Sequence, residues 1–458
     1  MKGNEIVMEF DEFKRIINSR AQDVGFSEWE IFYKRKNEFI VNVSEEKVDE
    51  YKLYKNIIIY FRGKYEGKIG KANTEVMDLE SIELLIQKVK ENAKILDCYS
   101  NEELFEGEKA YPQVDLYNEE IEKLETREKI NIAKKLEVCV YGIDKKVCGC
   151  SSCGLSTEEE ETQIANSRAL EISFKSNLIR VFVQPIVKDD NKTVNIYDEV
   201  VTRDIQSLDV EKLARKSVNE ALFYLNSKII ERGIYTAILS SRSSAKILNA
   251  FKEIFSGEVA MKGRSLLGNK IGEKVFSNLV SIHDNPLENN GLSCRPFDDE
   301  GVACRNKKIV EKGELKTFLH NRESARKAKC KSTGNGIKDF FTSNLTVMPI
   351  NMYIENGSKS FNEMIALLGN GIIIDELSSE SKRISIETGN FSYRGRGLKV
   401  ENGKITEPVD QIVVSGNYYE LLENIIEVGS DLKFIINDEK VSIGSPCLMV
   451  KKLAIESE

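Results

Sequence analysis

Residues 170–187 read LEISFKSNLIRVFVQPIV, and this stretch gives the strongest indication of the fold. Apolar side chains fall on alternating positions in two sets, first at Ile172, Phe174 and Leu178, with Ser176 between the last two, and then at Val181 and Val183. A period of two is typical of a strand that buries one face of an antiparallel sheet. The stretch therefore predicts a long strand in an antiparallel sheet.

The segments around this strand repeat one arrangement of helices and strands. Helical spacing of apolar residues predicts helices over 10–24, 81–95, 118–140 and 208–225. Strands are expected at 28–34, 38–43, 52–61, 146–153 and 160–165. The order helix, strands, helix thus occurs twice. It predicts two α+β lobes with mixed sheet and flanking helices, at 1–100 and 110–226, joined by a polar acidic linker at 100–113.

The pattern changes near residue 227. A strand at 235–239 and a helix at 243–255 precede many short strands that are separated by turns rich in Gly and Asn. Glu311–Glu314 and Glu401–Gly403 are examples of such turns. This spacing predicts a mostly β, barrel-like C-terminal domain over 227–458, and the fold class of the whole chain is α+β.

Composition excludes several classes of function. The 458 residues include 66 basic and 74 acidic ones, a net charge of −8, which gives no general affinity for nucleic acid. With only His283 and His320, the chain cannot contain a His-Glu-x-x-His zinc motif. No secretory signal or membrane-spanning run is found, and nine cysteines are typical of reduced thiols. We expect a cytoplasmic protein that binds no membrane.

Two stretches resemble ligand motifs but depart from them. Gly263–Lys270 nearly matches a phosphate-binding loop, yet it lacks the adjacent Gly-Lys pair and the hydroxyl that would hold Mg²⁺. Cys148, Cys150 and Cys153 have a spacing that could bind metal, but a structural zinc site needs four ligands. In a regular strand the first two would face one side and Cys153 the other. We therefore expect buried, reduced cysteines here.

Polar loops supply the remaining candidates for binding. Asp298–Gly301 is an acidic turn, and we consider Asp299 and Glu300 as candidate cation or substrate contacts beside the alternative of a self-capping turn. Two similar loops combine Gly with hydroxyl and amide side chains, which can pair with an extended peptide. Their candidate residues for a peptide groove are Ser332, Thr333, Gly334 and Asn335, and Thr388, Gly389, Asn390 and Ser392.

The C-terminal half resembles the TldD/PmbA family, once named modulators of DNA gyrase. The resemblance depends on an ordered set of short phrases rather than on any one of them. They are Lys262–Gly268, Asp284–Pro286, Phe297–Val302, Glu311–Lys316, Ser332–Gly336, Thr388–Ser392, Glu401–Gly403, Gly416–Asn417 and Gly444–Pro446. It covers about 233–453 well and extends loosely to 52–91 and 165–167.

In this family the resemblance implies paired subunits. The TldD-type subunit is a metallopeptidase with a helical His-Glu-x-x-x-His motif and a Cys ligand, whereas the PmbA or TldE-type partner lacks these ligands. Here Asn249, Ala250 and Ile254 stand at the motif positions, and Val428 stands at the Cys position. The resemblance therefore implies a PmbA/TldE-type chain with no catalytic or metal-binding residues of its own and no cofactor. Zinc or a similar divalent metal is expected in a TldD-type partner.

The implied function is that of the non-catalytic subunit of a TldD/TldE-type complex that degrades or processes small unfolded peptides. The expected partner is a TldD-type homologue or a second copy of the chain, joined through the C-terminal β domain, with the two Gly loops facing the partner's active site. Two alternatives remain open. The chain could be a stand-alone peptide-binding or scaffold protein, or a peptidase with an atypical site that uses His283 or the three cysteines.

Overall fold

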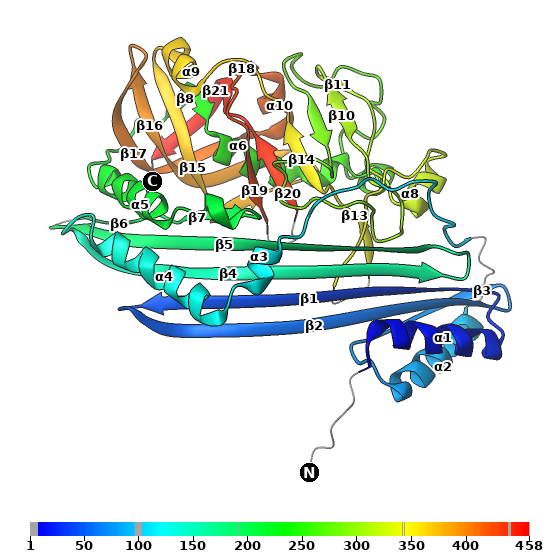
Figure 1. Cartoon of the computed structure of the whole chain (residues 1–458). Coiled ribbons are helices and arrows are strands. Elements are labelled where there is room, and N and C mark those ends of the chain that lie inside the picture. The colour runs from blue at the N-terminus through cyan, green and yellow to red at the C-terminus, as the bar shows by residue number, and fades with distance from the viewer. Residues whose placement is uncertain are drawn as a thin grey trace.

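The structure is a computed structural model that describes residues 8–96, 103–190, 192–340, 342, 344–437 and 441–457. Its largest element is a seven-stranded antiparallel sheet in the order β3-β2-β1-β4-β5-β6, with β7 also paired to β5. The strands run side by side beneath the C-terminal region in Figure 1. Their bounds are β1 Glu28–Ser44, β2 Lys47–Tyr65, β3 Lys68–Thr74, β4 Val147–Asn166, β5 Glu171–Asp189, β6 Lys192–Asn195 and β7 Asp198–Thr202.

The predicted strand at 170–187 is confirmed as β5, but its neighbours are longer than predicted. The expected pairs 28–34 and 38–43, and 146–153 and 160–165, are single strands, β1 and β4. The predicted breaks were wrong because the charged runs in each strand face each other across the ladder. Lys34 Nζ lies 2.9 Å from a Glu160 carboxylate oxygen, and Arg35 Nη2 lies 2.8 Å from Glu161. Opposite charges on neighbouring strands stabilise the sheet.

The two predicted N-terminal lobes contribute to one continuous sheet. β1 comes from the first predicted lobe and β4 from the second, and they pair from Glu30 opposite Asn166 to Asn42 opposite Gly154. The lobes therefore share their backbone hydrogen bonds, while the predicted domain boundaries themselves stay a prediction.

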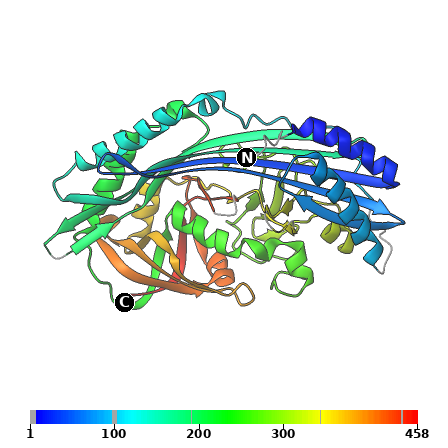
Figure 2. The same cartoon turned by 90° about the horizontal axis from the view of Figure 1, so that it is seen from below.

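Helices cover only one face of this sheet. The predicted helices are confirmed, except that 118–140 is divided into α3 and α4 at Leu124–Glu125. Figure 2 shows helices on one side of the sheet and the C-terminal region on the other. Among the described helices, none combines the length and the hydropathy needed to span a membrane. The bounds are α1 Phe10–Val24, α2 Leu79–Ile95, α3 Glu119–Lys123, α4 Thr126–Tyr141, the 3₁₀ helix η1 Ile205–Ser207 and α5 Val210–Tyr224.

The C-terminal region contains a closed barrel, as predicted. Strands β17-β16-β15-β8-β21 form a sheet that closes through pairing of β17 with β21, and β18 pairs with β21 outside the barrel. The overall fold is therefore α+β with a barrel. The bounds are β8 Gly233–Leu239, β15 Gly371–Ile384, β16 Asn390–Glu401, β17 Lys404–Asn417, β18 Ile425–Val428 and β21 Leu448–Ser457.

A second sheet packs beside the barrel in the order β11-β10-β9-β14-β20-β19, and the hairpin β12–β13 projects toward the long sheet. The strands of this second sheet are β9 Ile282–Asp284, β10 Lys307–Glu311, β11 Glu314–Leu315, β14 Asn351–Ile354, β19 Lys433–Ile436 and β20 Ser442–Ser445, and those of the separate hairpin are β12 Gly336–Lys338 and β13 Leu345–Val347. The helices of this region are α6 Ser241–Phe251, η2 Lys252–Phe255, α7 Gly257–Met261, α8 Arg322–Lys327, α9 Phe361–Leu368 and α10 Tyr418–Glu423.

The predicted turn at Glu311–Glu314 is confirmed between β10 and β11. Lys312 and Gly313 both have positive φ, +46° and +81°, as a two-residue hairpin turn requires. A Cβ on Gly313 would lie 2.3 Å from the carbonyl oxygen of Phe276, so this position has room only for glycine.

Candidate functional site

The positions that correspond to the family's metal motif lie at the end of α6 and in the next turn. Asn249 is half-buried, and its Oδ1 accepts a hydrogen bond of 2.9 Å from Asn437 Nδ2. Ala250 is also half-buried, against the C-terminal core. Ile254 is fully buried in that core. None of these side chains carries a nitrogen or sulfur lone pair suited to zinc.

The fourth position, Val428, is 4% exposed and belongs to the same core. The Cys447 thiol lies beside the next residue, Gly429, because a Cβ added to Gly429 would lie only 2.3 Å from Cys447 Sγ. Burial raises the pKa of Cys447, so this group stays a neutral thiol. The four positions therefore do not fit a catalytic metal. In the part of the chain that the structure describes, no three His, Cys, Asp or Glu residues are grouped to hold one.

The three clustered cysteines lie differently from the prediction. Irregular pairing between β4 and β5 adds one residue near Cys148 and another near Ser151. Cys150 therefore pairs with Pro185 and Cys153 with Val183, two positions apart on the face that α4 covers. The expectation that Cys153 faces away from Cys150 was wrong because of this bulge. The Cys150 thiol and burial both raise the pKa of Cys153.

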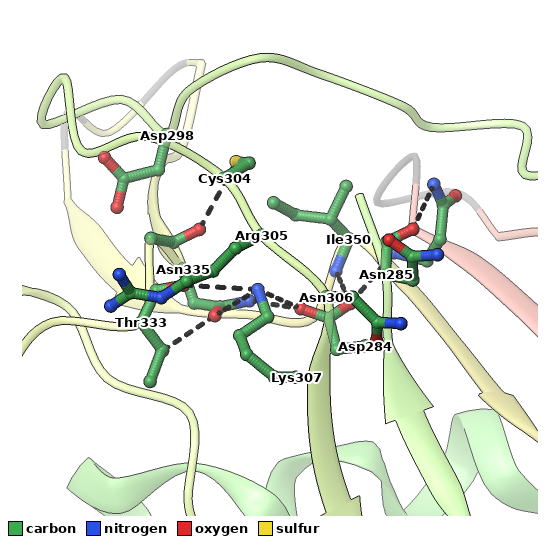
Figure 3. Close-up of polar contacts among 12 residues, drawn as sticks. Asp284, Asn285, Asp298, Cys304, Arg305, Asn306, Lys307, Thr333, Asn335 and Ile350 are labelled. Atoms are coloured by element: carbon green, nitrogen blue, oxygen red, sulfur yellow. Dashed lines mark hydrogen bonds and ion pairs between the residues drawn. The ribbon is translucent and has the colours of Figure 1, made fainter. Parts of the chain in front are cut away.

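The loop at Ser332–Gly336 faces inward and belongs to a buried polar network (Figure 3). Asn335 has no exposed surface. Its Nδ2 donates to Asp284 Oδ2 at 2.7 Å and to the Met348 carbonyl at 2.9 Å. Its Oδ1 accepts from Lys307 Nζ at 3.0 Å and from Thr333 Oγ1 at 2.8 Å. All four hydrogen-bonding positions of the amide are therefore occupied within the protein.

An ion pair lies at the centre of this network. Lys307 Nζ is 2.9 Å from Asp284 Oδ2, and both side chains are buried, with 5% and 0% exposure. Asp284 Oδ1 also accepts from the backbone N–H groups of Ile350 and Asn351 at 2.8 and 3.0 Å. The pair joins β9, β10, the Ser332–Gly336 loop and the start of β14. It therefore fixes the geometry of this part of the C-terminal region.

The second Gly loop, Thr388–Ser392, is at the turn between β15 and β16. Thr388 and Asn390 are exposed, whereas Gly389 is buried beneath Tyr419. Asn417 Nδ2 donates to the Thr388 carbonyl at 2.7 Å and to Asn390 Oδ1 at 2.9 Å. Both loops are thus braced by asparagine amides, but only this one presents polar side chains at the surface. A role of either loop in a peptide groove stays a prediction.

The difference between the loops predicts different effects of truncation. We expect Asn335→Ala to lower the free energy of unfolding by about 1–3 kcal/mol or more, because Lys307, Asp284 and Met348 each lose a buried partner. The matched change Asn390→Ala at the exposed loop is expected to cost less than about 0.5 kcal/mol. Urea denaturation of both variants measures this. Equal costs would contradict the inward assignment of the first loop.

The candidate residues of the acidic turn at Asp298–Gly301 are also buried, but outside the Asp284–Lys307 network. Asp298 and Asp299 have no exposed surface, and Glu300 is 5% exposed. Asp299 accepts from Arg295 Nη2 and from the Lys338 N–H, both at 2.8 Å. Burial acts to raise the pKa of Asp299, but the charge of Arg295 holds it below the usual range. Asp299 therefore holds hairpin β12–β13 in position through the Lys338 N–H. Its carboxylate does not lie at the surface.

His283 and the near-phosphate loop make contacts within the chain, among them His283 Nε2 with a Glu355 carboxylate oxygen at 3.6 Å, and an atypical peptidase site at His283 stays a prediction. The His283 ring stacks on Tyr353 at 5.3 Å, and its Nδ1 lies 3.3 Å from Asn306 Oδ1. Gly263–Lys270 is a largely exposed loop, and its Arg264 pairs with Glu387 at 2.9 Å.

No sequence motif indicated the cavity that lies between the long sheet and the C-terminal region. Its volume is about 120 Å³, and Arg203, Lys34 and Glu160 are among its lining residues. The sequence does contain a basic run at 34–36 and an acidic run at 158–161, which have opposite charge. These runs did not indicate Arg203, which follows the last residue of β7 and lines the cavity from there.

Comparisons with known proteins agree with this architecture. The PmbA/TldA metallopeptidase central domain matches residues 119–222, and the PmbA/TldA metallopeptidase C-terminal domain matches residues 232–457. A metalloprotease PmbA homolog of Buchnera aphidicola subsp. Acyrthosiphon pisum (strain APS) is 29% identical over 323 residues, 70% of this chain and 69% of the relative. The metalloprotease PmbA of Escherichia coli O157:H7 is 24% identical over 346 residues, 75% of this chain and 73% of that one.

Two solved structures are similar over nearly the whole chain. One is a Thermotoga maritima MSB8 protein described as a modulator of a DNA gyrase, with 29% identity, a TM-score of 0.88, and coverage of 98% of this chain and 100% of the other. The other is TldE from Thermococcus kodakarensis, with 22% identity, a TM-score of 0.87, and coverage of 97% and 100%. At 22% identity the second likeness shows the fold alone.

Proposed function

The chain belongs to the PmbA/TldD metallopeptidase family, and from this premise we propose that it is the non-catalytic subunit of a TldD/TldE-type complex. The complex would degrade or process small unfolded peptides in the cytoplasm. The partner would be a TldD-type homologue that holds zinc or a similar divalent metal. A second copy of the chain is the alternative partner, and the C-terminal β domain is the proposed contact in either case.

One observation carries the proposal. The metal-motif positions hold an amide that is hydrogen-bonded to Asn437, a methyl group and two core aliphatic side chains, at Asn249, Ala250, Ile254 and Val428. A hydrolytic metal site needs three protein ligands and an open position for water. Ile254 and Val428 instead contribute to apolar packing, so the same backbone positions stabilise the fold here.

The experiment is co-purification of the tagged chain from its native cell, with metal analysis of the captured material. We expect a homologue with a His-Glu-x-x-x-His motif in equal amount and about one metal ion per pair of subunits. The chain purified alone is expected to carry no stoichiometric transition metal and to cleave no peptide. A pair rebuilt with a partner whose motif Glu is changed to Gln should also be inactive.

The opposite result is equally clear. One zinc per chain that survives mild chelation in the isolated protein, or peptide cleavage by the isolated protein, would overturn the non-catalytic assignment. Capture of no homologue, with peptide binding retained, would favour the stand-alone peptide-binding protein.

A further inference from the structure

The cavity between the two halves of the molecule has a mostly polar floor, on the sheet side, and a mostly apolar roof, on the side of the C-terminal region. Lys34 of β1, Glu158 and Glu160 of β4, and Ser176 of β5 line it from the sheet. The C-terminal region supplies Ile337, Met348, Pro349 and Ile350, among others. A cavity with a few convergent polar groups among apolar walls is the usual form of a small-ligand site.

Most charges at this cavity already have partners. Lys34 Nζ lies 2.9 Å from Glu160, and Lys36 Nζ lies 3.8 Å from Glu158. Arg295 pairs with Asp299 at 2.8 Å. The negative charges of the two glutamates are therefore balanced by the positive charges of their lysines, and the floor of the cavity carries no net charge.

Arg203 is the exception. Its Nη1 and Nη2 donate to the carbonyl oxygens of Gly291 and Leu292 at 3.1 and 2.6 Å. Its Nε is buried and has no hydrogen-bond partner, and the guanidinium forms no ion pair with a carboxylate of the described residues. An arginine without a counter-charge in a buried position is costly, unless an anion completes the site.

We propose that this cavity binds the C-terminal carboxylate of a short peptide, with Arg203 as its counter-ion. The proposal deepens the proposed function, because it names the part of the substrate that this chain would hold. The guanidinium is a planar donor suited to a carboxylate, and Nη1 and Nη2 each carry a second N–H beside the one that a backbone carbonyl accepts. The apolar side chains of Phe174, Met348 and Ile350 would contact the last residue of the peptide.

Size and charge favour this ligand over other anions. A space of about 120 Å³ suits the end of a peptide rather than a folded protein. The described lining residues leave one positive charge without a counter-charge, which balances a monoanion but leaves one charge of a phosphate dianion unbalanced. A peptide amino terminus is disfavoured because both glutamates are already paired with lysines.

Isothermal titration of the full chain alone tests the proposal. The probes are N-acetyl-Ala-Leu with a free carboxylate, the same dipeptide as its C-terminal amide, and free leucine. We expect the acid to bind at least about tenfold more tightly than the amide, because a hydrogen bond to a charged group contributes about 1.5–3 kcal/mol. Free leucine should bind more weakly than the acid, because it lacks the peptide portion.

Arg203→Gln should abolish the preference for the acid, and Arg203→Lys should keep a weaker preference. The control Arg305→Gln changes an exposed arginine that donates to the Ser332 carbonyl outside the cavity, and it should bind like the wild type. Equal binding of acid and amide by the wild type, or a preference that survives in Arg203→Gln, overturns the proposal. Leucine binding as tightly as the acid overturns the peptide assignment.

If Arg203→Gln fails to fold, the acid–amide comparison on the wild type and on Arg203→Lys still decides the question. These measurements need neither a partner subunit nor a metal. The carboxylate proposal can therefore be refuted while the proposed complex is confirmed, or confirmed while the complex is refuted.

Discussion

Lys307→Ala is expected to lower the free energy of unfolding by about 3–5 kcal/mol, because it leaves the buried carboxylate of Asp284 without its counter-charge. Lys307 Nζ contacts Asp284 Oδ2, Asn335 Oδ1 and the Thr333 carbonyl, at 2.9 to 3.2 Å. The variant thus removes one charge and three hydrogen-bonded contacts at a site closed to water. Denaturation in urea, followed by fluorescence, measures the effect.

Its neighbour provides the matched control. Lys308 is on the same strand but exposed, and it pairs with Glu311 at the surface. Lys308→Ala is therefore expected to cost no more than about 1 kcal/mol. The double variant Asp284→Asn/Lys307→Met should recover part of the loss, since neither charge is then left alone. Similar costs for Lys307→Ala and Lys308→Ala would show that the buried pair does not stabilise the fold.

The Asp284–Lys307 network shows how much of the site could be predicted from sequence patterns. Each segment was visible: Asp284–Pro286 as one of the phrases that carry the family resemblance and Ser332–Gly336 as a polar Gly loop. Their association was not, because Asp284 and Asn335 are 51 positions apart and meet only when β9, β10 and β14 pair. Polar side chains in a loop are exposed to solvent on average. Here they are buried instead, because each of them finds a hydrogen-bond partner inside the protein.

The fold itself was more accessible, because its strongest signals are local. Apolar periodicity predicted α1 and β5 almost to the residue, and the turn Lys312–Gly313 needed only its own residue types. The length of β1 and β4 was missed because a charged run in isolation is typical of a loop. Only the opposing run on the neighbouring strand makes these residues compatible with a sheet, and that pairing is a tertiary property.

A small apolar cluster joins the sheet to the C-terminal region, and Phe297 is its central side chain. Phe297 comes from the C-terminal region and is 2% exposed. Its ring meets Phe174 of β5 edge-on at 5.2 Å and Tyr111 at 5.7 Å. Phe32, Ile164 and Leu170 complete the cluster from the sheet side. This cluster borders the proposed carboxylate cavity, since Phe174 belongs to both.

Phe297→Ala is therefore expected to lower the free energy of unfolding by about 3–5 kcal/mol, through lost burial and the cavity that remains. Phe223→Ala, at a ring on α5 that is 44% exposed, is the control and should cost about 1 kcal/mol or less. Because Phe174 and Phe297 are in contact, the double variant should deviate from additivity by about 0.5–3 kcal/mol. Additive costs, or a loss below about 1 kcal/mol for Phe297→Ala, would mean that the two halves are held together mainly by their charged contacts.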